Sequence, residues 1–219
     1  VHYLPDYDYA SHAEGPDAAH DALARSDDAI GALMDAAGGP DEFLERYAVI
    51  LCSDHGQSRV ENVARLQAGD DLVTASNRAA MVYTDKPRRV AESLDAEPSA
   101  GIVVFRENGR VVARRDGDED GALLDAVPDG HARAAAALAN PNAGAVIVSA
   151  APGWEFLDLA GRHHLGGGSH GSLEPGDSEV PMLTVGLGEP PASITQVKGA
   201  IVGHFAVSAS REPERTATR

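Results

Sequence analysis

The chain has 219 residues, of which 43% are hydrophobic, and this excludes intrinsic disorder over most of its length. A single cysteine, Cys52, excludes intrachain disulfides, and no apolar run approaches the ~20 residues that span a bilayer. A count of 18 Lys and Arg against 34 Asp and Glu gives a net charge of −16, so we expect no nucleic-acid polymer as a partner, because phosphate contacts need cations. No basic segment followed by an apolar core opens the sequence, so we expect no signal peptide and favour a cytoplasmic location.

The first sixty residues predict strand, polar loop and helix in alternation. Residues 1–4 are expected to end a buried strand, and the polar residues of 6–14 are typical of an active-site loop at the carboxyl end of a strand. Pro16 is expected to begin a helix, with apolar residues at helical spacing: Leu23, Ile30, Leu33, Met34 and Ala37. The apolar run 48–52 predicts a buried parallel strand that leads into a second polar loop, 53–57.

The alternation of strand, polar loop and helix stops after residue 60 and resumes near residue 165. We expect an α/β core over 1–60 and 165–208, with a small α+β lobe inserted over 61–164. Within the lobe, the Asn108-Gly109 pair predicts an antiparallel hairpin between 102–105 and 110–113, outside the main sheet. Three further elements are expected there, namely strands at Ala79–Tyr83 and 143–150 and a helix at Pro87–Leu94.

The returning chain contains a glycine-rich loop at 166–171. A last strand is expected at 181–185 and a terminal helix at 194–205. Residues 209–219 are polar and are expected to be a frayed tail.

Three groups of metal-ligand side chains lie in the polar loops: Asp8 with His12, Asp54 with His55, and His170. Imidazole and carboxylate are ligands of zinc and other divalent metals, and both offer lone pairs at neutral pH. Each group alone is a weak signal, since an isolated Asp-His pair is more often a surface pair than a ligand set. Their common position at predicted strand ends makes a shared metal site the stronger hypothesis.

Other candidate residues have ordinary structural explanations. Cys52 lies in an apolar run without an adjacent base or cation, which indicates a buried structural thiol rather than a nucleophile. His163 and His164 are interpreted as a solvated loop pair, although they could line a site near His170.

Four segments together resemble one enzyme family. Residues 8–16 match D-x-x-x-H-x-x-G-P, residues 53–56 read S-D-H-G, residues 168–171 match G-x-H-G, and residues 180–182 match a V-P-hydrophobic strand. Their order and spacing resemble the type I phosphodiesterase/nucleotide pyrophosphatases of the alkaline phosphatase superfamily. The resemblance implies a three-layer α/β sandwich of the alkaline phosphatase type, here without its N-terminal strands.

The resemblance also implies a hydrolase of small phosphate esters with two divalent metal ions, zinc in the first place and manganese as the alternative. Asp8, His12 and His170 would hold one ion. Asp54 and His55 would hold the other. Two ions about 3.5–4 Å apart can clamp a phosphate and stabilise both the attacking and the leaving oxygen. Neither a membrane partner nor a particular oligomeric state is implied.

In this family a further metal-binding Asp and a Thr or Ser nucleophile precede the D-x-x-x-H segment. The chain begins just before that segment, so we expect it to be the C-terminal part of a longer enzyme and to be incomplete for catalysis alone. Neither Thr74 nor Ser76 has the helix-start context of such a nucleophile. Two alternatives stay open: another branch of the superfamily (phosphonate hydrolase, sulfatase or phosphoglycerate mutase), and a non-catalytic metal-binding module.

Overall fold

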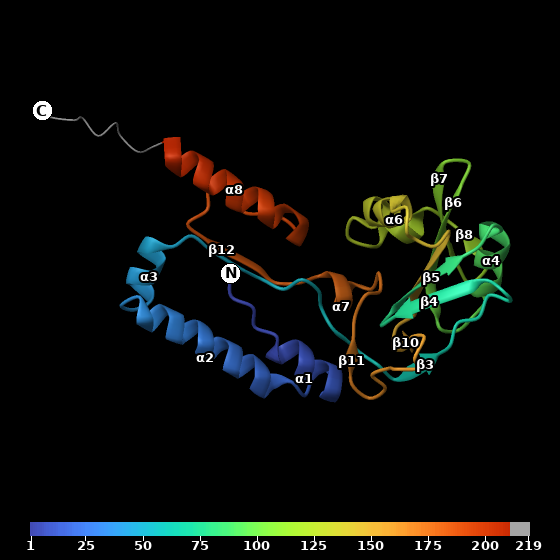
Figure 1. The fold of residues 1–219 in the computed structure, drawn as a ribbon, viewed down its shortest axis with the longest axis horizontal. Coiled ribbons are helices and arrows are strands. Elements are labelled where there is room, and N and C mark those ends of the chain that lie inside the picture. The colour runs from blue at the N-terminus through green and yellow to red at the C-terminus, as the bar shows by residue number, and fades with distance from the viewer. Residues whose placement is uncertain (211–219) are drawn as a thin grey trace, which may run out of the picture. The chain divides into compact units, whose positions relative to one another are not determined.

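The computed structural model describes residues 1–210 and has a mixed α/β fold (Figure 1). It divides into two compact units. The first contains Val1–Ser26 and His55–Glu179, and the second contains Asp27–Asp54 and the chain from Val180 onward. The division into a core and an inserted lobe at residues 61 and 164 stays a prediction, and so does the three-layer sandwich.

A six-stranded antiparallel sheet is the centre of the first unit, with its strands in the order β4-β5-β9-β6-β7-β8. The strands are β4 (Leu72–Ser76), β5 (Ala79–Tyr83), β6 (Ala100–Glu107), β7 (Arg110–Arg115), β8 (Asp118–Glu119) and β9 (Val146–Ala150).

Helices cover both faces of this sheet (Figure 1). Along β6, Val103 and Phe105 point to one face, where they pack with α4 (Pro87–Leu94). Ile102 and Val104 point to the other, where they join a cluster that includes residues of α5 (Ala122–Asp125) and α6 (Gly130–Ala139). Because successive side chains alternate between faces, burial on both sides requires the continuous apolar run of this strand.

The predicted antiparallel hairpin is confirmed, but it does not stand apart from a larger sheet, because both of its strands belong to the six-stranded sheet. β6 and β7 pair antiparallel from Val103 opposite Arg114 to Glu107 opposite Arg110. Asn108 and Gly109 form the turn with φ of 49° and 79°, as the two central residues of a type I′ turn require. The expected strand at Ala79–Tyr83 and the expected helix at Pro87–Leu94 are found with these bounds, and the strand expected at 143–150 begins at Val146.

Shorter elements surround the metal-ligand residues in the first unit. They are α1 (Asp6–Glu14), β2 (Ser58–Arg59), β3 (Asn62–Ala64), β10 (Trp154–Phe156), β11 (Gly168–Ser169) and α7 (Pro175–Ser178). β2 pairs antiparallel with β11, which connects the segment after His55 to the segment before His170. β3 pairs parallel with β10.

A buried ion pair joins the six-stranded sheet to the segment after His170. Arg78, between β4 and β5, donates from Nη1 to Asp177 Oδ1 at 2.6 Å, and the two side chains are 1% and 0% exposed. Asp177 also accepts from Ser58 Oγ at 2.5 Å and from the backbone N and the Oγ of Ser172 at 2.8 and 2.7 Å. The buried charges are therefore paired and hydrogen-bonded, the condition under which buried ions are tolerated.

The second unit contains α3 (Pro40–Arg46), β1 (Val49–Cys52), β12 (Met182–Val185) and α8 (Ile194–Ser210). It also contains the end of α2 (His20–Ala36), which begins in the first unit. β1 and β12 form a two-stranded antiparallel sheet in which Leu51 lies opposite Leu183. No helix among residues 1–210 combines the length and the apolar character that crossing a membrane requires.

Several expectations about local structure are wrong. Residues 1–4 form no strand, and no strand of the described chain pairs with them. The run 48–52 contains β1, but its partner runs antiparallel and the strand is only partly buried. The helix expected from Pro16 begins at His20, because residues 16–19 form turns after Gly15, whose φ is 92°.

The last strand and helix lie where they were expected, at β12 and α8. Residues 209 and 210 of the expected tail still belong to α8, and residues 211–219 lie outside the described residues.

We expect Asp177→Asn to lower the free energy of unfolding of the first unit by about 3–5 kcal/mol, because it leaves the Arg78 charge buried without a counter-ion. Urea unfolding followed by the fluorescence of Trp154, the single tryptophan, measures this change. Asp125→Asn is the control, since Asp125 is 71% exposed and pairs only with an exposed histidine, His131. Equal effects of the two substitutions would contradict the central role of the buried pair.

Candidate metal centre

Two of the metal-ligand residues lie on one face of a helix. Asp8 and His12 were expected in a loop, but both belong to α1, which places residues four apart on the same face. His12 Nε2 lies 3.5 Å from Asp8 Oδ1. The acidic residues Asp6 and Asp8 occupy the first turn, where the helix dipole favours negative charge. The helix therefore places a carboxylate and an imidazole side by side.

Backbone carbonyls orient the imidazoles of His12 and His55. His12 Nδ1 lies 2.8 Å from the Gly168 carbonyl oxygen, and His55 Nδ1 lies 2.9 Å from that of Gly56. A carbonyl oxygen only accepts, so Nδ1 donates in both rings, and in the neutral form Nε2 keeps its lone pair. His55 Nε2 lies 3.9 Å from Asp8 Oδ1, so both Nε2 atoms are close to the same carboxylate oxygen.

Glycine allows the loop before His170 to pass close to α1. A Cβ atom on Gly167 would lie 2.0 Å from the His12 carbonyl oxygen, and one on Gly168 would lie 2.8 Å from that of Ser11. No real Cβ atom tolerates such approaches to backbone. The glycines therefore bring the Gly168 carbonyl to His12 Nδ1, where it fixes the ring.

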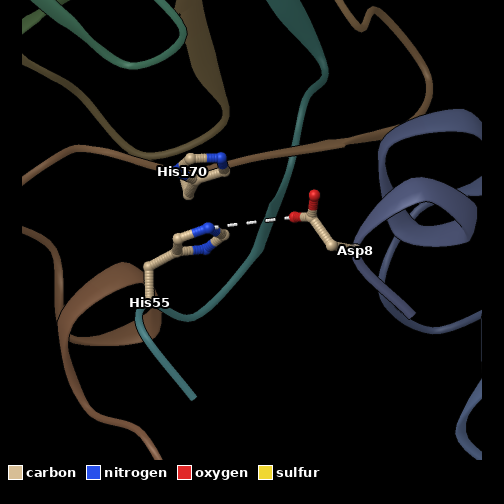
Figure 2. A group of neighbouring side chains, drawn as sticks. All are labelled: Asp8, His55 and His170. Carbon is tan, nitrogen blue, oxygen red and sulfur yellow. Dashed lines mark ion pairs between the residues drawn. The ribbon is translucent and has the colours of Figure 1, made fainter. Parts of the chain in front are cut away.

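His170 completes the group and lies against the ring of His55 (Figure 2). Its ring stacks on His55 with 3.5 Å between centroids and 9° between planes, and its Nε2 lies 3.1 Å from Asn77 Nδ2. Burial lowers the pKa of His170, and the neighbouring His55 and His12 lower it further. The lowered pKa keeps the imidazole neutral at pH 7, which is the form that binds a metal.

One ligand atom each of Asp8, His55 and His170 lies within 4.8 Å of the others (Figure 2). Two imidazole nitrogens and a carboxylate oxygen are a donor set that suits zinc. Asp8 Oδ1 also accepts from Gln57 Nε2 at 2.7 Å, which orients the carboxylate as an outer partner does in metal sites. His55 Nε2 and Asp8 Oδ1 both carry lone pairs and lie 3.9 Å apart, and a divalent ion between them would relieve their repulsion.

The structure brings together three of the five residues that the sequence indicated. His12 lies beside Asp8 but outside the group of three, and its ring centroid is 5.2 Å from that of His170. Asp54 is exposed and belongs to the second unit. The group thus combines Asp8 and His170 with His55, which the family resemblance assigns to the other ion. The assignment of the five residues to individual ions stays a prediction.

Several residues that support the centre are not among those that the sequence indicated. Gln57 lies in the polar loop that contains His55, so its position could have indicated a role. Asn77 has a positive φ of 55°, which asparagine tolerates better than most residues, and an isolated Asn in a turn carries no signal of its histidine partner.

His164 is not a solvated loop residue. Its Nδ1 lies 2.7 Å from an oxygen of Glu155, which is 1% exposed, and its ring centroid is 4.2 Å from that of His12. Nothing in the sequence around Glu155 shows that it is buried.

A comparison with protein families gives a match over most of the chain. The family model of type I phosphodiesterase / nucleotide pyrophosphatase matches residues 1–173, which include all five residues indicated by the sequence. Searches of curated proteins and of solved structures gave no match.

We expect Asp8→Asn to weaken zinc binding by about 100-fold or more, because the neutral amide removes the charged ligand of the group. Competition with a chromophoric chelator measures the affinity. Asp6→Asn is the matched control, since Asp6 lies in the same helical turn but pairs with Arg25. A similar loss in both variants would mean that helix charge, rather than a ligand at Asp8, governs the affinity.

The lowered pKa of His170 predicts a pH dependence of the metal-free protein. The unfolded chain takes up a proton on this residue near its ordinary pKa of about 6.5, before the native protein does. The contribution of His170 to stability is therefore full above about pH 6.5 and is lost as the pH falls through the lowered native pKa. We expect His170→Gln to make the acid decline of the unfolding free energy shallower when unfolding is measured with a chelator present. An unchanged decline would contradict the shift.

Proposed function

The chain belongs to the type I phosphodiesterase/nucleotide pyrophosphatase family, and from this premise we propose that it is part of a metal-dependent hydrolase of small phosphate esters. The observation that carries the proposal is the convergence of Asp8, His55 and His170. Among these residues, the Nε2 atom of His55 and a carboxylate oxygen of Asp8 lie 3.9 Å apart while Nδ1 of His55 donates to a carbonyl. A divalent cation satisfies this arrangement better than any group of the described chain.

The charge of the protein supports the same proposal. A chain with a net charge of −16 repels a phosphate ester, so its site needs a local source of positive charge. Bound divalent ions would supply that charge to the phosphate oxygens. The protein residues would hold the ions and orient the ligands: the carbonyls of Gly56 and Gly168 fix the imidazoles of His55 and His12, and Gln57 fixes the Asp8 carboxylate.

We propose two ions, zinc in the first place and manganese as the alternative. The ligand sets remain those implied by the resemblance, with Asp8, His12 and His170 for one ion and Asp54 and His55 for the other. Both His12 Nε2 and His55 Nε2 lie within 4 Å of Asp8 Oδ1, which is compatible with ions bound side by side. We further propose that the α/β core is of the alkaline phosphatase type.

The nucleophilic Thr or Ser of the family is proposed to lie outside residues 1–219. None of the positions that match the family pattern in this chain corresponds to that hydroxyl. Removal of a nucleophile usually removes most of the rate of a covalent phosphoryl transfer, so the chain alone is expected to turn over substrate slowly.

The test compares the 219-residue chain with the intact gene product on a chromogenic phosphodiester, with zinc and with a chelator. We expect slow turnover by the chain and at least 100-fold faster, chelator-sensitive turnover by a gene product that supplies the hydroxyl. Asp8→Asn in the gene product should abolish turnover, and Asp6→Asn should leave it nearly unchanged.

Robust zinc-dependent turnover by the chain alone would contradict the absence of a nucleophile from it. Zinc binding with no turnover of phosphodiesters, phosphomonoesters or sulfate esters by either form would favour the non-catalytic metal-binding module.

A further inference from the structure

We propose that Asn77 is a positioning residue for His170 and that its side-chain amide determines which imidazole nitrogen is offered to the metal. The inference rests on the proposed metal site and adds to it a residue from the turn between β4 and β5. Asn77 and His170 are 93 residues apart in the sequence, and their side chains meet with Nδ2 and Nε2 at 3.1 Å.

The turn that carries Asn77 is fixed by backbone hydrogen bonds on three sides. The Asn77 carbonyl accepts from Phe156 N at 2.9 Å, and the Arg78 carbonyl accepts from Ala150 N at 2.9 Å. Arg78 N donates to the His170 carbonyl at 3.0 Å. Arg78 thus holds the backbone of His170, and the adjacent residue Asn77 contacts its ring.

The side chain of Arg78 anchors the same turn. Its guanidinium donates to the carbonyl oxygens of Trp154 and Ala151 at 3.0 and 3.2 Å, in addition to the buried pair with Asp177. Asp177 in turn accepts from Ser172 N, two residues after His170. The turn and the His170 loop therefore form one hydrogen-bonded body, and Asn77 has a fixed base from which to orient the ring.

The contact engages Nε2 of His170, so the metal would bind Nδ1, and this requires the Asn77 amide to accept from Nε2 rather than donate to it. In the observed orientation the Asn77 amide donates to Nε2, and the neutral ring then carries its proton on Nδ1. A half-turn of the carboxamide presents Oδ1 instead, which accepts from Nε2–H. The ring then takes a proton from water at Nε2 and returns one from Nδ1, so its charge does not change and Nδ1 gains a free lone pair. The Asn77 amide can hydrogen-bond to either tautomer of His170, because Nδ2 donates, Oδ1 accepts, and both atoms are the same distance along the side chain.

A purely conformational role for Asn77 makes a different prediction. Its φ of 55° is in the left-handed region, and glycine adopts that region at no steric cost. If the turn needed only this conformation, Asn77→Gly would be harmless. Asn108 offers a matched control, because it occupies the turn between β6 and β7 with a φ of 49°, and its side chain makes no hydrogen bond to a histidine of residues 1–210.

The experiment measures zinc affinity of the 219-residue chain by chelator competition for the wild type, Asn77→Gly, Asn77→Asp and Asn108→Gly. We expect Asn77→Gly to weaken binding by about 10–100-fold, as loss of an outer partner of a metal ligand does. Asn77→Asp should stay within a few-fold of the wild type, since its carboxylate accepts from Nε2–H. Asn108→Gly should not change the affinity.

Histidine ¹⁵N NMR of the zinc-loaded protein gives a second result that folding alone would not alter. We expect His170 to carry its proton on Nε2 in the wild type and in Asn77→Asp, and to lose this preference in Asn77→Gly. Urea unfolding of each variant shows whether the turn itself is intact.

The outcomes separate the two proposals. If Asn77→Gly bound zinc as tightly as the wild type, or if zinc bound to Nε2 of His170, the positioning role of Asn77 would be overturned. The proposed metal site would still stand if Asp8→Asn weakened zinc binding. Absence of zinc binding by the wild-type chain would overturn both.

Discussion

The buried ion pair of Arg78 and Asp177 is the interaction on which the site depends most. Neither side chain can reach water, so each charge has to be balanced within the protein, and breaking the pair costs more than breaking any exposed pair. The pair joins the turn between β4 and β5 to the segment that follows His170. A histidine in a glycine-rich loop would otherwise have many orientations, and the pair with its surrounding hydrogen bonds leaves it few.

The remaining geometry of the centre follows from hydrogen bonds to half-buried polar side chains. Backbone carbonyl oxygens accept hydrogen bonds from Nδ1 of His12 and of His55. The Asn77 amide is hydrogen-bonded to Nε2 of His170, and Gln57 donates to an oxygen of Asp8. The carbonyl partners of His12 and His55 leave a lone pair on each Nε2, close to the Asp8 carboxylate. The metal-binding character of the group therefore comes from the outer hydrogen bonds as much as from the ligand residues themselves.

Sequence patterns predicted the local features well. Asn108-Gly109 specified a hairpin because only a few residue pairs adopt its turn. Three of the family motifs contain Asp8, His55 and His170, which are three of the five indicated residues and lie close together. The helical placement of Asp8 and His12 was missed. The antiparallel pairing of β1 was missed as well, since it depends on a partner distant in the chain. The same limit applies to Asn77 and to the Arg78–Asp177 pair, whose members are 99 residues apart. No local sequence pattern indicates which two buried charged residues will form an ion pair.

The location of a bound ion tests this account most directly. Anomalous X-ray scattering at the zinc edge, recorded from crystals of the zinc-loaded chain, shows where the metal lies. The account predicts a peak about 2.0–2.2 Å from a carboxylate oxygen of Asp8 and from ring nitrogens of His55 and His170. A zinc ion bound elsewhere, for example at the exposed pair of His131 and Asp125, with no peak among these three residues, would contradict it.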